Sequence, residues 1–506
     1  MTPDADATAP EPTSGRADPV PADNLLERLF RIRERGSTPW REVRGGLVTF
    51  FAMCYIIVLN PIILSTPDST GQYLGGGTEG ANFAAIAAGT ALVAGVMSIL
   101  MGSVANFPLA VAAGLGINAL LAYTIVGMEG MTWGDAMGLI VLEGIVILIL
   151  VLTGLREAIF RAVPPSLKTG ISVGIGLFIA LIGVVNAGIV RPGAGTPLEF
   201  GIGGSIASWP LVVFVLGLVL ILVLMARKVR GALLIGIVVA TAVAAIVEAI
   251  SSQGTQTPDG ANPGGWGLTV PSIEGSIVQV PDFATLGEFS LFGAFEKIGI
   301  VAVLVLIFSI MLADFFDTMG TMVAVAAEGD LLDEQGNPPA TRRILVIDSI
   351  AAAAGGAGGV SSNTSFVESA AGVGDGARTG LASVVTGVCF LLATFLSPLA
   401  EAVPYEAATP ALVVVGFLMM QQVVEIPWKN LSLAIPAFLT IIFMPFSYSI
   451  AVGIGVGVVA YAILMTTTGQ ARKVHPLMWG VVVAFAIYFA LEPFQDLLAM
   501  LGLMDR

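Results

Sequence analysis

Long apolar segments, repeated along almost the whole chain, constrain the fold most strongly. A helix of about 20 mostly apolar residues can cross a bilayer. Fifteen such segments run near 44–64, 82–102, 107–128, 136–154, 168–190, 209–226, 231–250, 297–326, 344–359, 361–376, 380–400, 409–426, 432–446, 449–467 and 477–494. Only 11% of the 506 residues are charged and 56% are hydrophobic, which leaves too little polar surface for a water-soluble globule. The sequence therefore predicts an all-α polytopic membrane protein in a lipid bilayer with about 14 transmembrane helices, one segment being short, re-entrant or merged.

The remaining composition argues against several other classes of protein. The net charge is -14 and no basic stripe is present, so nucleic acid is not an expected partner. The two cysteines, Cys54 and Cys389, and the single histidine, His475, cannot supply a disulfide framework or a metal cluster. The sequence shows no pair of a nucleophile and a base that would indicate an enzyme. We therefore expect no cofactor, no metal and no catalytic residues.

Charges between the apolar segments predict the orientation of the bundle. Lys and Arg gather before the first span and in the even-numbered connections, whereas the odd-numbered connections are acidic or neutral. By the positive-inside rule, the N- and C-termini are expected in the cytoplasm. Residues 1–23 predict a disordered tail, 24–43 an amphipathic helix on the cytoplasmic surface, and the polar residues 251–295 an extracytoplasmic loop.

Two segments are too polar or too rich in glycine to be plain lipid-facing helices. They are Asn106–Tyr123 and Val360–Gly380, and they share the pattern A-A-G-[LV]-G at Ala112–Gly116 and Ala370–Gly374, 258 residues apart. An odd number of spans separates the two halves, so the copies are expected to be inverted. Interrupted segments at matching positions of two halves indicate a transporter's binding site. Their small residues could alternatively serve tight helix packing.

Acidic residues inside apolar spans are the third signal. Asp314 and Asp317 lie three residues apart on one face of the expected helix 297–326. One central Asp costs about 2.5–3.5 kcal/mol on insertion scales, so two in one helix indicate a function. Glu368 and Asn118 lie in the two interrupted segments. Because burial disfavours the charged form of a carboxyl group, Asp317, Glu368 and Asp314 are the candidate proton carriers.

Structural roles remain open for some of these polar residues. Asp314 could hold a neighbouring helix through hydroxyl groups, and Asn118 could join two helices by a hydrogen bond. Glu143 and Asp348 lie in regular spans, which favours a structural role for both.

Four motifs together resemble one known family. They are F-F-A-M-C-Y-I-I-V-L-N-P (50–61), A-A-G-L-G-I-N-A (112–119), D-F-F-D-T-M-G-T (314–321) and T-S-F-V-E-S-A-A-G-V-G-D-G-A-R-T-G (364–380). From about Pro39 to the last span, the chain is similar to the azaguanine-type purine permeases. These permeases are the adenine and guanine/hypoxanthine branch of the nucleobase–cation symporters, which are related to the uracil and xanthine permeases.

The resemblance implies a particular architecture. It has two inverted repeats of seven spans, with a short strand and a half-helix in spans 3 and 10 and the substrate between them. A core would comprise residues 44–163 and 296–403, and a gate residues 164–250 and 404–506. The long loop at 251–289 is less typical of the family.

The resemblance also implies a function and a site. It places Asp317 at the substrate-binding acid and Thr321 one turn later, with Glu368 and Asn118 at two further family positions. The residue chemistry adds amide donors near Phe366 and Val367, and a ring from Phe315, Phe316 or Phe366 that could stack on a purine. The expected function is import of guanine/hypoxanthine or adenine by proton symport, through an alternating core and gate movement in a bacterial inner membrane. A sodium-coupled nucleobase carrier and an anion transporter of the same fold are the alternatives, and a homodimer is a candidate assembly.

Overall fold

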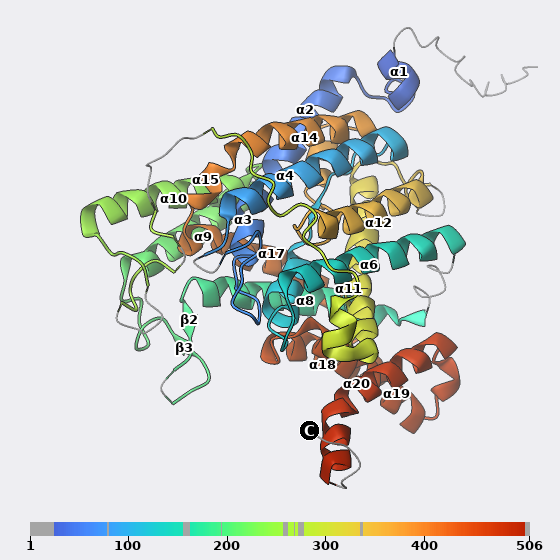
Figure 1. The fold of residues 1–506 in the computed structure, drawn as a ribbon. Coiled ribbons are helices and arrows are strands. Elements are labelled where there is room, and N and C mark those ends of the chain that lie inside the picture. Colours follow the sequence, from blue (N-terminus) through green and yellow to red (C-terminus); the bar gives the residue numbers. More distant parts are fainter. Residues whose placement is uncertain are drawn as a thin grey trace, which may run out of the picture.

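The computed structural model describes residues 25–77, 80–154, 162–193, 195–256, 262–267, 269–271, 278–333 and 337–500. The predicted tail at 1–23 lies outside this part of the chain, as do Arg156 and Arg161. Within the described residues, nine helices are long and apolar enough to cross a membrane, and shorter apolar helices accompany them. Helices dominate the fold and strands are few (Figure 1). The predicted all-α polytopic membrane fold is confirmed.

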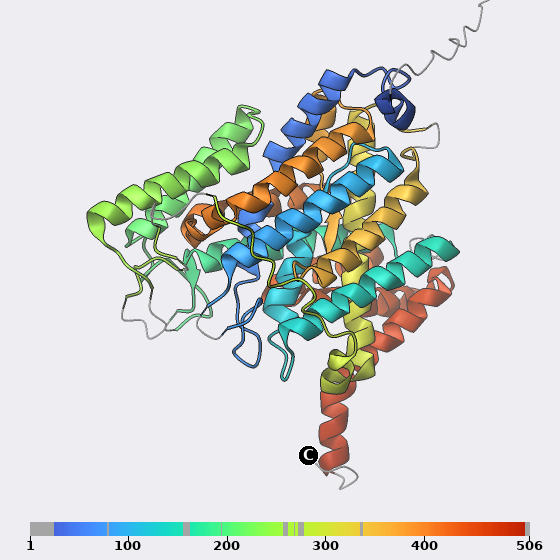
Figure 2. The same ribbon diagram turned by 45° about the horizontal axis from the view of Figure 1, so that its top comes forward.

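One group of helices comes from both halves of the chain. Its long blue, orange, gold and teal helices run roughly side by side in Figure 2, and its yellow helix runs at an angle to them. Glycine allows close backbone approach between them: a Cβ atom on Gly95 would lie 2.9 Å from the Gly387 carbonyl oxygen, and one on Gly356 would lie 2.8 Å from the Met137 carbonyl oxygen. The group comprises α2 (Pro39–Met53), α3 (Ile56–Ile63), α4 (Phe83–Leu100), α5 (Leu115–Leu120), α6 (Trp133–Thr153), α11 (Gly293–Glu328), α12 (Thr341–Ala357), α13 (Ser369–Gly374) and α14 (Gly380–Ala393).

A second group packs around the long helix α8. A Cβ atom on Gly176 of α8 would lie 2.9 Å from the Gly416 carbonyl oxygen of α17, so these helices also meet closely. Pro436 and Pro445 lie inside α18, and a turn at Ser447–Ser449 separates α18 from α19. The group comprises α8 (Pro165–Asn186), α9 (Trp209–Ala226), α10 (Ala232–Ser251), α16 (Tyr405–Ala408), α17 (Pro410–Met420), α18 (Leu431–Phe446), α19 (Ile450–Thr467) and α20 (Pro476–Met500).

The two interrupted segments each form a strand followed by a short helix, as predicted. Strand β1 (Val111–Ala113) precedes α5, and strand β4 (Asn363–Ser365) precedes α13. The strands pair antiparallel, with Val111 opposite Ser365 and Ala113 opposite Asn363. Ser98 of α4 fixes β1, because its hydroxyl accepts from the Val111 amide at 3.0 Å and donates to the Val111 carbonyl at 3.1 Å. Buried non-helical backbone in this bundle is thus paired with partners.

The register of the repeat differs from the one that the shared pentapeptide indicates. Ala112 and Ala113 end β1 and Gly114 precedes α5, whereas Ala370–Gly374 lies inside α13. Strands β1 and β4 begin 252 residues apart, at Val111 and Asn363, and not 258. The pentapeptides are therefore not equivalent in the structure. The small residues lie at the end of a strand and the start of a helix in the first copy, and inside a helix in the second copy.

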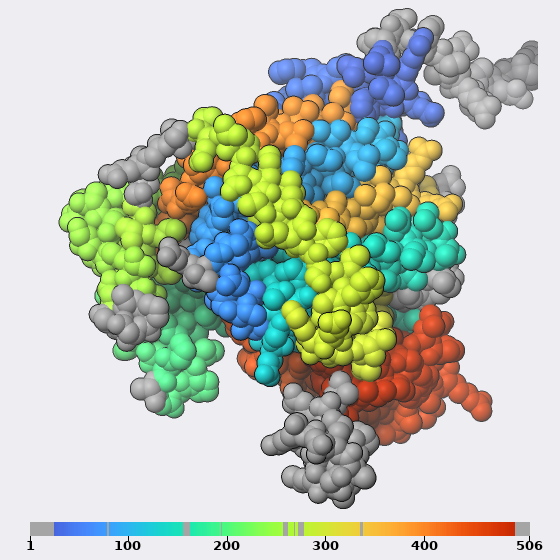
Figure 3. Space-filling model, viewed as in Figure 1, coloured from blue at the N-terminus to red at the C-terminus, as the bar shows by residue number. Residues whose placement is uncertain are grey.

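The connection from α10 to α11 crosses the ends of several helices of the first group (Figure 3). The Gln279 amide donates to the Phe395 carbonyl at 3.0 Å, the Gly287 amide to Ala357 at 2.8 Å and the Ser290 amide to Gly134 at 2.8 Å. The described part of this predicted loop is therefore held against the bundle.

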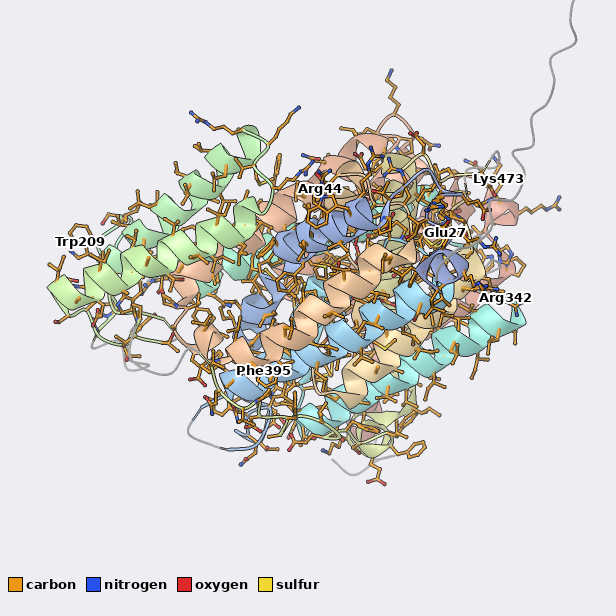
Figure 4. The ribbon with its side chains drawn as sticks, turned by 90° about the horizontal axis from the view of Figure 1, so that it is seen from above. Glu27, Arg44, Trp209, Arg342, Phe395 and Lys473 are labelled. Carbon is orange, nitrogen blue, oxygen red and sulfur yellow. The ribbon has the colours of Figure 1, made fainter. Side chains whose placement is uncertain are left out.

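The N-terminal region forms a shorter helix than the one expected at 24–43. Helix α1 covers Leu25–Phe30, and Arg31 follows with a φ of 52°. Figure 4 shows Arg44, Arg342 and Lys473 toward one end of the helices, with Glu27, whereas Trp209 and Phe395 lie toward the other. The remaining elements are η1 (Met101–Ala105), η2 (Leu121–Ile125), β2 (Val190–Arg191), β3 (Glu199–Phe200), η3 (Thr394–Leu396), α15 (Pro398–Glu401), η4 (Gln421–Glu425) and η5 (Ala471–Lys473).

Candidate functional site

A cavity of about 770 Å³, including the space at its mouth, lies where the two interrupted segments meet α8, α11 and α17. Its walls therefore come from both helix groups. The lining residues are Tyr55, Gly114, Leu115, Gly116, Ile117, Ile171, Ser172, Ile175, Ile179, Ala313, Phe316, Asp317, Thr321, Ser365, Phe366, Val367, Glu368, Val415 and Met419. Six of the predicted site residues are among them: Asp317, Glu368, Thr321, Phe316, Phe366 and Val367.

Two carboxyl groups supply the negative charge of the cavity. Asp317 comes from α11 and Glu368 from the turn between β4 and α13. Asp317 is exposed and Glu368 is half-buried, although both lie in membrane-spanning elements, because they face the cavity. The two groups are close enough for the charge of Glu368 to act on Asp317.

Tyr55 holds Glu368 in place, and the sequence reasoning missed it. Its hydroxyl donates to Glu368 Oε1 at 2.5 Å. Tyr55 lies at the break between α2 and α3, inside the first-span motif 50–61, and its side chain is buried. The sequence feature that could have identified Tyr55 is its hydroxyl group, which lies within an otherwise apolar stretch of the first-span motif.

The other walls of the cavity are apolar and tight. Ile171, Ile175 and Ile179 of α8 lie on one side, and Phe316 of α11 is a ring on another. A Cβ atom on Gly116 would lie 2.7 Å from Ile175 Cγ2, so glycine is needed where α5 faces α8. This geometry suits a flat apolar molecule with polar edges.

The backbone of the second segment limits which amides can bind a ligand. The Phe366 amide donates to the Ala110 carbonyl at 3.0 Å and thereby extends the pairing of β1 with β4. The Phe366 ring lines the cavity, but its amide is already used. The sequence predicted amide donors near Phe366 and Val367. Because the Phe366 amide is already paired, the Val367 amide is the one that could bind a ligand.

Asn118 and Asp314 do not line the cavity. Asn118 is fully buried, and its Nδ2 donates to Asn60 Oδ1 at 2.6 Å. Asn60 donates in turn to Thr90 Oγ1 at 2.7 Å and to the Val360 carbonyl at 3.1 Å. Asn118 therefore joins α5 to α3 and, through Asn60, to α4. Asp314 lies on α11 one turn before Asp317, and its side chain is 1% exposed.

Two interrupted segments that meet at a cavity inside a bundle of membrane helices are typical of transporters. Residues 41–454 match the model of the Permease family (Xan_ur_permease). The chain belongs to this family, and it is a membrane transporter rather than an enzyme.

Named relatives match nearly the whole chain. The guanine/hypoxanthine permease PbuG of Bacillus subtilis is 38% identical over 470 residues, which cover 92% of this chain and 99% of the relative. The adenine permease AdeP of Escherichia coli is 36% identical, with 92% of this chain and 95% of the relative covered. The transmembrane domain of the cyanobacterial bicarbonate transporter BicA has a TM-score of 0.55 at 14% identity, with 82% of this chain and 97% of that domain covered. This last likeness concerns the fold alone.

Proposed function

We propose that the protein carries a purine nucleobase across the membrane, and that the cavity between the two interrupted segments is its binding site. The observation that supports this most is the meeting of Asp317 and Glu368 in one cavity with apolar walls. The similarity to a guanine/hypoxanthine permease and an adenine permease over most of the chain supports the choice of substrate.

The cavity offers partners for both the edges and the face of a purine. Ring N–H groups would donate to the carboxylates of Asp317 and Glu368, and the Val367 amide would donate to a ring acceptor or exocyclic oxygen. Phe316 or Phe366 would pack against the ring face. Thr321 lies one turn after Asp317 on α11 and could bind a remaining polar edge. Asn118 would act through the scaffold.

Coupling to protons is part of the proposal. Acids at membrane depth in a cavity with apolar walls favour the neutral form, because partial desolvation disfavours charge. A purine that binds one protonation state more tightly would take up or release a proton by linkage. A sodium-coupled carrier would use the same acids together with carbonyl oxygens as ion ligands, and the sodium dependence of uptake distinguishes it from a proton-coupled carrier. An anion carrier is disfavoured because the cavity presents two acids.

Movement of the two helix groups would give alternating access. The core would comprise residues 44–163 and 296–403, and the gate residues 164–250 and 404–506. The cavity lies between α11 and the interrupted segments on the core side and α8 and α17 on the gate side. Asp375 also bridges the groups, because it pairs with Arg44 of α2 and with Arg230 before α10.

Uptake of radiolabelled guanine, hypoxanthine and adenine in a bacterial strain that lacks its own purine transporters tests the proposal. We expect saturable uptake that the other purines compete for, that a protonophore abolishes, and that sodium leaves unchanged. Uptake that depends on sodium would show that sodium, and not the proton, is the coupling ion. Absence of purine uptake in cells with the protein in their membrane would overturn the function.

A further inference from the structure

Three carboxyl groups lie together in the interior of the first helix group, outside the cavity. They are Glu143 of α6, Asp314 of α11 and Asp348 of α12, and their side chains are 0%, 1% and 0% exposed. They are close enough for the charge of Asp348 to act on both other groups, and for that of Glu143 to act on Asp314. Helix α6 packs along both α12 and α11, and a hydrogen bond from Thr318 of α11 to Asp348 joins α11 to α12.

The carboxyl group of Glu143 has nothing to offset a negative charge. Among the described residues, neither of its oxygens has a hydrogen-bond partner. The carboxyl group of Asp314 lies close to the Thr364 hydroxyl. Asp348 differs, because its Oδ1 accepts from Thr318 Oγ1 and from Ser365 Oγ, each at 2.9 Å.

The charged groups of the neighbouring elements do not neutralise the cluster. Asp317, which lies one turn after Asp314 on α11, is itself acidic, and its charge acts on Asp314. Lys297 of α11 pairs with Asp135 at the first turn of α6, and Lys168 of α8 lies over the Phe316 ring. Arg342 and Arg343, at the start of α12, reach the backbone carbonyls of Leu152 and Val104.

An ionised carboxylate without a partner, as at Glu143, is very costly in such an interior, and two further acids nearby raise this cost. A cation or a proton must therefore offset the charge. Neither oxygen of Glu143 has a hydrogen-bond partner among the described residues. A proton on this carboxyl group removes the charge and needs no further ligands.

A chain of hydroxyl groups links this cluster to the cavity. Thr318 Oγ1 is 2.9 Å from Thr364 Oγ1, and Thr364 lies in β4 four residues before Glu368. Ser365, which donates to Asp348, lines the cavity. Asp314 and Asp317 also share helix α11, so one rigid element carries one acid of each site.

We propose that Glu143, Asp314 and Asp348 form a second proton-binding site, distinct from the cavity, which exchanges at least one proton during transport and senses the substrate through β4 and α11. This inference rests on the proposed purine transport and adds the location of a coupling proton. A proton bound here would change the hydrogen bonds that Asp348 accepts from Thr318 and Ser365. Occupancy of the two sites would thereby be linked.

Proton counting on the purified protein tests the site. Calorimetric binding of guanine, hypoxanthine or adenine in buffers of different ionisation heat gives the number of protons exchanged per purine. We expect Glu143→Gln to bind purine and to catalyse purine exchange, but to exchange about one proton fewer and to lose accumulation driven by a pH gradient. An unchanged proton count with normal accumulation would overturn the proposal.

Glu42→Gln is the matched control. Glu42 is also fully buried, but its carboxylate accepts hydrogen bonds from the amides of Arg378 at 2.9 Å and Thr379 at 3.1 Å, which Glu143 lacks. A loss of one proton in this variant as well would show that any buried carboxyl change has the same effect, and would overturn the assignment.

Infrared titration without purine separates this inference from the transport function. In the Asp317→Asn, Glu368→Gln double variant, absorption of protonated carboxyl groups should persist at neutral pH, because the second site is intact. Loss of that absorption would overturn the second site, even if Glu143→Gln proves unable to fold. Persistent absorption in a protein that binds no purine would support the site while the proposed function fails.

Discussion

The two interrupted segments share one scaffold but differ in chemistry. The first brings Gly114, Leu115, Gly116 and Ile117 to the cavity, none of which has a polar side chain. The second brings Ser365, Phe366, Val367 and Glu368. The paired strands β1 and β4 thus bring both segments to the cavity, whereas the acidic side chains that line it come from the second segment and α11.

The acids should show the largest effect, because they give the second segment and α11 their chemistry. Replacing Asp317 or Glu368 by alanine removes a charged acceptor, and loss of each such hydrogen bond costs about 1.5–3 kcal/mol, with further cost for an unpaired purine N–H. We expect purine uptake to fall at least about 100-fold, with normal insertion into the membrane. Glu296→Gln, at an exposed position on α11, is the control. Near-normal uptake in either acid variant would contradict the claim that the acids of the second segment and α11 bind the purine.

Tyr55→Phe should have the next largest effect. It removes the hydroxyl that donates to Glu368 and leaves the ring in place. Loss of a hydrogen bond to a charged group, about 1.5–3 kcal/mol, predicts an apparent affinity about 10–100-fold weaker. Uptake kinetics measure this, with Tyr461→Phe on α19 as the control. An unchanged affinity would mean that Glu368 needs no positioning partner.

Gly116→Ala tests the packing role of the first segment. The new Cβ would meet Ile175 Cγ2 at 2.7 Å, and overpacking of this kind costs about 1–3 kcal/mol. The second residue of α13, Ala370, already carries a Cβ, so the restriction belongs to α5 alone. We expect slower transport, measured as a lower maximal rate. Gly480→Ala, where a Cβ would meet nothing within 4 Å, should leave the rate unchanged.

Asp375→Asn should have the smallest effect. Burial raises the pKa of Asp375, but hydrogen bonds from Arg230 and Arg44 outweigh burial and lower this pKa below 3.8. Because the pKa of Asp375 is lower in the folded state, its ion pairs with Arg44 and Arg230 stabilise the folded protein above about pH 3.8. This stabilisation is lost as the pH falls through the folded-state pKa. Because both arginines are about half exposed, we expect at most about 1 kcal/mol. Thermal unfolding in detergent at pH 7 should therefore change little, whereas a large loss would show that the bridge is a major constraint.

Sequence periodicity and polarity predicted the membrane fold, both interrupted segments and the two cavity acids, Asp317 and Glu368. The reason is that unpaired backbone groups and charges are unfavourable in lipid. A polar, acidic or glycine-rich interruption of an apolar segment therefore stands out in the sequence alone. Thr321 was predicted from the family resemblance, and Phe316, Phe366 and Val367 from the chemistry of a purine site. The register of the repeat was not predictable in this way, because A-A-G-x-G satisfies a strand end and a half-helix equally well. The roles of Asn118 and Tyr55 also depend on long-range partners, Asn60 and Glu368, which no local pattern specifies.

Equilibrium binding of radiolabelled guanine, hypoxanthine and adenine to the purified protein tests the central claim most directly. The account predicts that the unmodified protein and Glu296→Gln bind at least one of these bases, and that Asp317→Asn and Glu368→Gln bind it at least about 10-fold more weakly while remaining folded. Binding of equal strength in all four proteins would contradict the claim that these two acids hold a purine in the cavity.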